Sequence, residues 1–178
     1  MKALREGWFE HRFDDTWTVS KYDEWPFYID HFQSQCGANK AVDFVARDPA
    51  EALWLVELKD YRAYPRTKAI ELADEVAMKV RDSLAGIVAA AKWHSDHAHR
   101  AEATDHLKAR RLRVVLHLEP PPHHSKLSPG RALLANVQQK LKQLVRAVDA
   151  HPLVLNLATL GGVRGGRGVP WQAVSIQE

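Results

Sequence analysis

The alternation of apolar and polar positions predicts strands and helices in a definite order along the chain. Two apolar stretches, residues 40–46 (KAVDFVA) and 52–61 (ALWLVELKDY), are joined by a short polar connection at Asp48 and Pro49. Because this connection is short, we expect the two strands to form an antiparallel hairpin. Further strands are predicted at residues 112–120, 152–160 and 171–176.

Apolar residues that recur every three or four positions predict two amphipathic helices. The first covers residues 68–93 with Thr67 as its N-cap, and the second covers residues 129–149 with Ser128 as its cap. Between them, residues 94–111 are polar and mixed in charge. This segment either extends the first helix or forms a loop followed by a short helix.

The first 39 residues are rich in aromatic side chains. A strand is predicted at residues 16–22, and Pro26 is well placed to open a helix. The aromatic residues could stack on nucleic-acid bases, but packing in the core is the favoured interpretation. They are Trp8, Phe9, Phe13, Trp17, Trp25, Phe27, Tyr28 and Phe32.

The order of these elements indicates an α/β fold. An antiparallel hairpin followed by helix, strand, helix and strand predicts a mixed β-sheet that is flanked by helices on both faces. With 178 residues, the chain is expected to form one domain over residues 1–178. Residues 1–39 then form an N-terminal aromatic-rich segment, and residues 161–178 form a glycine-rich, basic tail.

The composition is that of an ordinary globular protein with mild basicity. Hydrophobic residues make up 46% of the chain, the net charge is +3 and the isoelectric point is near 9.0. This charge permits a nucleic-acid partner without requiring one. Cys36 is the only cysteine, which excludes an internal disulfide. No apolar run reaches the roughly 20 residues that span a bilayer, so a cytoplasmic location without a membrane partner is expected.

Three charged residues stand out within the predicted hairpin. Glu57 and Lys59 interrupt an apolar strand and are two positions apart, so their side chains project from the same face. Pairing of the two strands would bring Asp43 beside them. Charged groups on a mostly buried sheet are costly to desolvate unless they serve a purpose such as holding a metal ion. The alternative is a buried structural salt bridge.

The segments VDFVA and WLVELKDYR on adjacent strands, followed by a helix, resemble the PD-(D/E)xK nuclease superfamily. The resemblance extends over roughly residues 20–160 and implies a restriction-endonuclease-like fold. Asp43 and the triplet from Glu57 to Lys59 match the acidic residues and the lysine of the motif, whereas Val42 replaces its proline.

This resemblance implies a metal-dependent mechanism. Asp43, Glu57 and the Leu58 carbonyl would hold Mg²⁺, for which Mn²⁺ can substitute, and Lys59 would orient a water or stabilise the transition state. The superfamily often uses one more acidic residue from a preceding helix. Its candidates are Asp23, Glu24 and Asp30.

Other polar segments offer weaker signals. Arg62, Arg66 and Lys68 follow the triplet and either steer nucleic acid or remain solvated surface residues. Arg164 and Arg167 in the glycine-rich tail either contact a nucleic-acid backbone or belong to a mobile connection. A histidine-rich segment, residues 94–106, is interpreted as a solvated helix end or loop rather than a zinc site.

The sequence therefore predicts a Mg²⁺-dependent nuclease that hydrolyses phosphodiester bonds of DNA, with Asp43, Glu57 and Lys59 as catalytic residues. DNA is preferred over RNA because the resemblance implies it, and RNA is not excluded. The resemblance also implies a homodimer or a larger nuclease or defence complex. The alternative is a non-catalytic nucleic-acid-binding or assembly module on the same fold.

Overall fold

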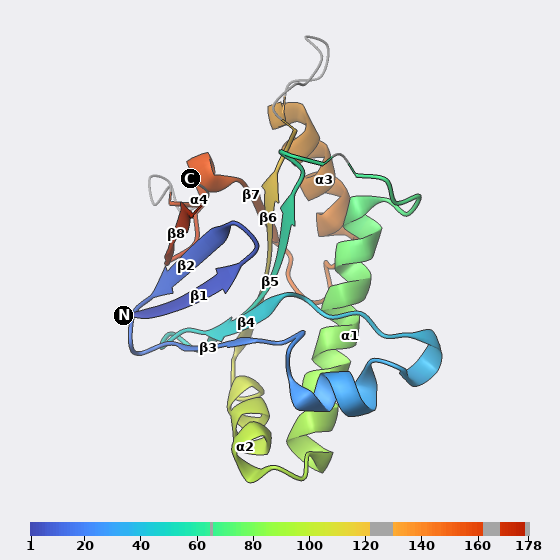
Figure 1. The fold of residues 1–178 in the computed structure, drawn as a ribbon, viewed down its shortest axis with the longest axis vertical. Coiled ribbons are helices and arrows are strands. Elements are labelled where there is room, and N and C mark those ends of the chain that lie inside the picture. Colours follow the sequence, from blue (N-terminus) through green and yellow to red (C-terminus); the bar gives the residue numbers. More distant parts are fainter. Residues whose placement is uncertain (65, 122–129, 162–167, 177–178) are drawn as a thin grey trace.

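Five strands form the central sheet in the order β3-β4-β5-β6-β7 (Figure 1). The computed structural model describes residues 1–64, 66–121, 130–161 and 168–176. The strands β3, β4 and β5 pair antiparallel, whereas β5, β6 and β7 pair parallel. Their bounds are β3 Thr18–Lys21, β4 Phe44–Arg47, β5 Ala52–Asp60, β6 Arg111–Glu119 and β7 Leu153–Leu155.

Helices cover one face of this sheet. Figure 1 shows α1 (Leu72–Trp93) and α3 (Gly130–Leu144) side by side on that face, with α2 (His97–His106) near the end of α1. The helices α1 and α2 connect β5 to its parallel neighbour β6. Within the described ranges, no helix is both long and apolar enough to cross a membrane.

A small second sheet covers the opposite face. It has the order β1-β2-β8, with β1 at Lys2–Glu6, β2 at Phe9–Phe13 and β8 at Gln172–Ser175. Between the two sheets lies an aromatic core that includes Phe13, Trp17, Phe44, Trp54 and Trp171. Most of the aromatic residues of the N-terminal segment are buried, so core packing is confirmed for them.

The predicted fold class is confirmed: the protein is a mixed α/β structure with helices flanking the sheet. On the second face, the short helix α4 (Leu157–Leu160) accompanies the three-stranded sheet. The hairpin of β4 and β5 is antiparallel, as expected. For residues 94–111, the structure selects the loop and short helix, because the Asp96 carboxylate caps α2 by accepting hydrogen bonds from two backbone N–H groups.

Several element boundaries differ from the prediction. The apolar segment 152–160 is not one strand, because Asn156 ends β7 and forms a capping box with Thr159 at the start of α4. The helix α1 begins at Leu72, so Thr67 is not its N-cap; that position is held by Glu71. The helix α3 ends at Leu144 rather than at residue 149. Ser128 lies outside the described residues.

The connection of the β4–β5 hairpin fixes the register of the two strands. The Asp48 carboxylate accepts hydrogen bonds from the backbone N–H of Ala52 at 2.8 Å and from the Trp54 indole N–H at 2.9 Å. Glu51 takes the left-handed conformation that this tight connection requires, with φ of 62°. The resulting register pairs Phe44 with Val56 and so brings the start of β4 next to Glu57.

Gly86 permits a close approach between α1 and the N-terminal segment. A Cβ atom at this position would lie 2.0 Å from the Tyr22 hydroxyl and 3.1 Å from the ring of Phe32. Tyr22 is almost fully buried, so its ring has little room to move.

We predict that Gly86→Ala destabilises the protein. Alanine favours a helix by about 1 kcal/mol over glycine, but overpacking a core costs roughly 1–3 kcal/mol. The free energy of unfolding, measured by urea denaturation, should therefore fall. In a Tyr22→Phe background, which removes the clashing oxygen, the same substitution should recover most of the loss. A Gly86→Ala protein as stable as its parent would contradict this packing.

Candidate functional site

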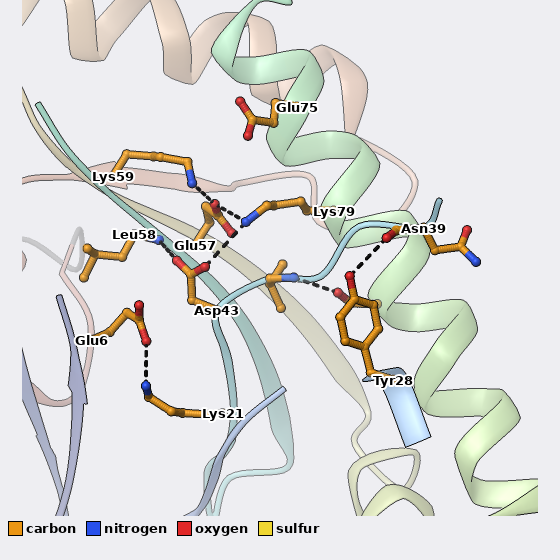
Figure 2. A network of polar contacts seen from close by, with 12 residues as sticks. Glu6, Lys21, Tyr28, Asn39, Asp43, Glu57, Leu58, Lys59, Glu75 and Lys79 are labelled. Atoms are coloured by element: carbon orange, nitrogen blue, oxygen red, sulfur yellow. Dashed lines mark hydrogen bonds and ion pairs between the residues drawn. The ribbon is translucent and has the colours of Figure 1, made fainter. Parts of the chain in front are cut away.

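Two strands and one helix bring four charged side chains together on the helical face of the sheet. Asp43 lies just before β4, Glu57 and Lys59 lie on β5, and Lys79 comes from α1 (Figure 2). The three residues expected from the sequence are thus neighbours in space. Lys79 is the fourth member, and we call this group the charge cluster.

Glu57 is the centre of the charge cluster. Its side chain is completely buried, and its Oε1 atom contacts the ammonium groups of both Lys59 and Lys79, the latter at 2.6 Å. The Lys79 ammonium also lies 3.4 Å from Asp43 Oδ1. Glu57 Oε2 has no hydrogen-bond partner among the described residues. Two carboxylates and two ammonium groups therefore balance one another, with one carboxylate oxygen left over.

Burial governs the protonation of the charge cluster. Burial and the nearby Asp43 carboxylate raise the pKa of Glu57 to about 7, although Lys79 and Lys59 oppose the shift. Burial acts to lower the pKa of Lys79, but the attraction of Glu57 and Asp43 outweighs it and raises that pKa. The cluster consequently holds a carboxylate that titrates near neutral pH beside a permanently charged lysine.

The helix α1 also positions the segment that carries Asp43. The Asp82 carboxylate accepts a hydrogen bond from the Lys40 N–H, and the Ser83 hydroxyl accepts one from the Val42 N–H, both at 2.9 Å. On the other side, the Asp43 carbonyl accepts a hydrogen bond from the Tyr22 N–H of the segment after β3. Asp43 is therefore fixed by backbone contacts to two neighbouring elements.

Sequence reasoning missed Lys79 because lysines on a helix are normally assigned to the solvent face. A signal was present, however. Glu75, Lys79, Asp82 and Ser83 recur at intervals of three or four residues and form a polar stripe beside the apolar one. Such a stripe on a helix that packs on a sheet indicates polar partners on the sheet, here Glu57 and the segment before β4.

The oxygen atoms of the charge cluster are of the kind that hard divalent cations take as ligands. Asp43 Oδ1 and Glu57 Oε1 converge on one position, now held by the Lys79 ammonium. The Leu58 N–H donates to Asp43 Oδ2 at 2.6 Å, and in a strand the carbonyl of the same residue points to the same side. Mg²⁺ commonly uses one or two carboxylates and keeps several waters. In the described ranges, no group of three or more histidine, cysteine, aspartate or glutamate side chains gathers as a metal site.

Among the acidic residues of the N-terminal segment, Asp23 is the one influenced by the charge cluster. Burial, followed by the charges of Asp43 and Glu6, raises the pKa of Asp23 to about 6. Glu24 instead pairs with Lys21 at 2.7 Å, and Asp30 is exposed. Of the three candidates, Asp23 is therefore the one whose charge interacts with Asp43, but in the described ranges it does not join Asp43 and Glu57 as a third metal ligand.

The basic residues proposed to contact nucleic acid have acidic partners. Arg62 pairs with Asp60 and lies over the ring of Phe9, on the side of the small sheet. Arg66 and Lys68 both pair with Glu75 on α1, at 2.7 and 2.6 Å. Arg164 and Arg167 lie outside the described residues.

Comparison with known proteins gives one informative similarity. The chain is 29% identical over 208 aligned residues to a cysteine–tRNA ligase of Neisseria meningitidis serogroup A. The alignment covers 96% of this chain and 29% of that protein. The chain thus spans under a third of the length of the relative and is similar to part of an enzyme. No family model matches the chain, and no solved structure matches it.

This similarity corrects the predicted function. The prediction of a DNA nuclease is wrong, as are the terms nuclease and endonuclease, because the relative is a tRNA ligase. The pattern of Asp43, Glu57 and Lys59 specifies an arrangement of charge and does not specify the substrate. Lys79 adds a second positive charge beside the carboxylates, which the motif alone does not include. The resemblance to the PD-(D/E)xK superfamily is not addressed by these comparisons and stays a prediction.

We predict that Glu57 makes stability fall with increasing pH. Between its ordinary pKa of 4.5 and about 7, the folded protein retains a proton that the unfolded chain has released. The free energy of unfolding should decrease by about 1 kcal/mol per pH unit across this window. Glu57→Gln should remove this decrease with pH, whatever the substitution does to the absolute free energy of unfolding. The measurement is urea denaturation of both proteins from pH 4 to 8, and parallel pH profiles would contradict the assignment.

Proposed function

We propose that this chain is a tRNA-binding module related to part of an aminoacyl-tRNA synthetase, and that the charge cluster contacts the phosphate backbone of the RNA. The observation that carries the proposal is the convergence of two ammonium groups and two carboxylates on one buried position. The similarity to a cysteine–tRNA ligase supports tRNA as the nucleic acid. The ligase activity itself is not carried over, because the chain aligns with under a third of that protein.

The two kinds of charge have complementary roles in this proposal. Lys59 lies at the edge of the cluster with 17% of its side chain exposed, so its ammonium can reach a phosphate oxygen. The carboxylates of Asp43 and Glu57 would repel a phosphate unless a cation lies between the carboxylates and the phosphate. We propose that Mg²⁺ is bound by Asp43, Glu57 and the Leu58 carbonyl. When bound, the ion would neutralise phosphate charge at this position.

In this proposal, Mg²⁺ and the Lys79 ammonium compete for the same position between the carboxylates of Asp43 and Glu57. The ammonium already occupies the position on which the carboxylate oxygens converge. Entry of the ion would move the ammonium outward, where it becomes a second donor to the phosphate. The mild basicity of the chain, with a net charge of +3, is consistent with a nucleic-acid partner.

We predict that Lys59→Ala weakens tRNA binding by about tenfold, because one contact between an ammonium and a phosphate is lost. The slope of the logarithm of the binding constant against the logarithm of salt concentration should fall by about one. The measurement is fluorescence anisotropy with labelled tRNA at several salt concentrations. Lys92→Ala is the matched control, since it removes an exposed lysine from the C-terminal end of α1.

The same assay tests the cation and the choice of nucleic acid. Mg²⁺ should strengthen binding to the parent protein, and Asp43→Asn should abolish this dependence. Duplex DNA of similar length should bind more weakly than tRNA. Equal losses in Lys59→Ala and Lys92→Ala, or equal affinity for tRNA and DNA, would argue against the proposal.

A further inference from the structure

A cavity of about 560 Å³ lies next to the charge cluster on the helical face of the sheet. Its walls come from the loop after β5, the start of α1, the end of β6 and one side of α3. Its lining residues include Tyr61, Leu72, Leu118, Leu133, Asn136 and Val137. A cavity of this size lined mostly by apolar side chains is typical of a small-molecule site.

The cavity neighbours the charge cluster along the sheet and along α1. Along the sheet, Lys59 pairs in register with Leu118, and Tyr61 is the next residue on the same face of the chain as Lys59. Across the helix, Glu75 pairs with Arg66 and Lys68, which both line the cavity. If one group of a ligand contacts Lys59, the adjoining group of that ligand is therefore within reach of the cavity.

Glu75 interacts electrostatically with residues of both the cavity wall and the charge cluster. Burial acts to raise its pKa, but hydrogen bonds from Lys68 and Arg66 outweigh this and lower the pKa to about 2, with a further contribution from the Lys59 charge. Glu75 is thus ionised at all physiological pH values. Arg66 also donates a hydrogen bond to the Tyr61 hydroxyl at 3.1 Å, which fixes the aromatic side chain at the cavity wall.

We infer that this cavity binds one unstacked nucleobase of the RNA whose phosphate contacts Lys59. The inference rests on the proposed function and adds a base-binding site to it. The lining supplies what such a base requires: an aromatic ring from Tyr61, apolar walls, and an amide from Asn136 with both a donor and an acceptor. Lys68 and Lys140 also line the cavity, where Lys68 pairs with Glu75 and Lys140 pairs with Glu71 and Asp74.

The size and polarity of the cavity favour a base over the other groups of a nucleic acid. A bare phosphate or a ribose would leave the apolar walls of Leu72, Leu118 and Val137 without contact. A duplex would not fit, because its bases are stacked and paired. A single base turned out from a strand buries its faces against apolar and aromatic side chains and keeps its edge for the Asn136 amide.

Adenosine 5′-monophosphate and ribose 5-phosphate are the probes that test this site. Each is titrated into the full chain while backbone N–H resonances are followed by NMR. The nucleotide should bind at least tenfold more tightly than the sugar phosphate and should shift the resonances of Tyr61, Leu118 and Asn136. Equal affinity of the two probes, or shifts confined to the charge cluster, would overturn the inference.

Two matched variants of α3 locate the base. Asn136→Trp places a large side chain at the cavity wall from an exposed position and should remove the advantage of the nucleotide over the sugar phosphate. Ala135 is exposed and does not line this cavity, so Ala135→Trp should keep that advantage. Urea denaturation checks that both variants are folded. If Asn136→Trp retains the full tenfold advantage, the base does not bind in this cavity.

The outcomes separate this inference from the function on which it rests. Lys59→Ala should weaken nucleotide and sugar phosphate alike, because both carry the phosphate. If tRNA binding depends on Lys59 but the nucleotide gains nothing over the sugar phosphate, the base site is refuted and the tRNA-binding function stands. If the nucleotide binds in the cavity but tRNA binding is unaffected by Lys59→Ala, the proposed function fails.

Discussion

The burial of the Glu57 carboxylate is the constraint on which the site depends. A charged group taken from water into the interior loses several kcal/mol of solvation, and only close opposite charges or protonation recover it. Lys59 and Lys79 supply those charges from a strand and from a helix. The ion pairs of the cluster therefore hold β5 to α1 in addition to the apolar packing between them. Any cation that enters the cluster must compete with an ammonium already in place.

The helix α1 serves two purposes because two stripes of its surface are buried. Its apolar residues, including Val76, Val80 and Ile87, pack on the sheet in the main core. Its polar stripe holds the segment before β4 through Asp82 and Ser83 and carries Lys79 to the charge cluster. A helix that is buried on both stripes cannot shift along the sheet without breaking specific hydrogen bonds. This explains why Asp43 and Glu57 keep a defined relation although no regular strand pairing extends to Asp43.

The sequence predicted what depends on short-range patterns. The β4–β5 hairpin, β6, β8 and the existence of α1 and α3 follow from periodicity within one segment, and the hairpin was enough to bring Asp43, Glu57 and Lys59 together. The β1–β2 hairpin was missed because FEHRF buries His11 and Glu10, so its alternation does not look like that of a half-buried strand. The DNA-nuclease function was predicted wrongly for a related reason: three charged residues define a local field, whereas a substrate is selected by larger surfaces that distant segments assemble.

The small sheet ties the two regions of the chain that are farthest apart in sequence. Strand β2 pairs with β8, and the Trp171 indole donates a hydrogen bond to His11, 160 positions away. During synthesis, β2 therefore has a partner on one side only until residue 175 has left the ribosome. An unpaired strand edge with a partly apolar face is prone to associate with other chains. The small sheet is thus complete only after β8 has been synthesised, and until then the free edge of β2 is open to such association.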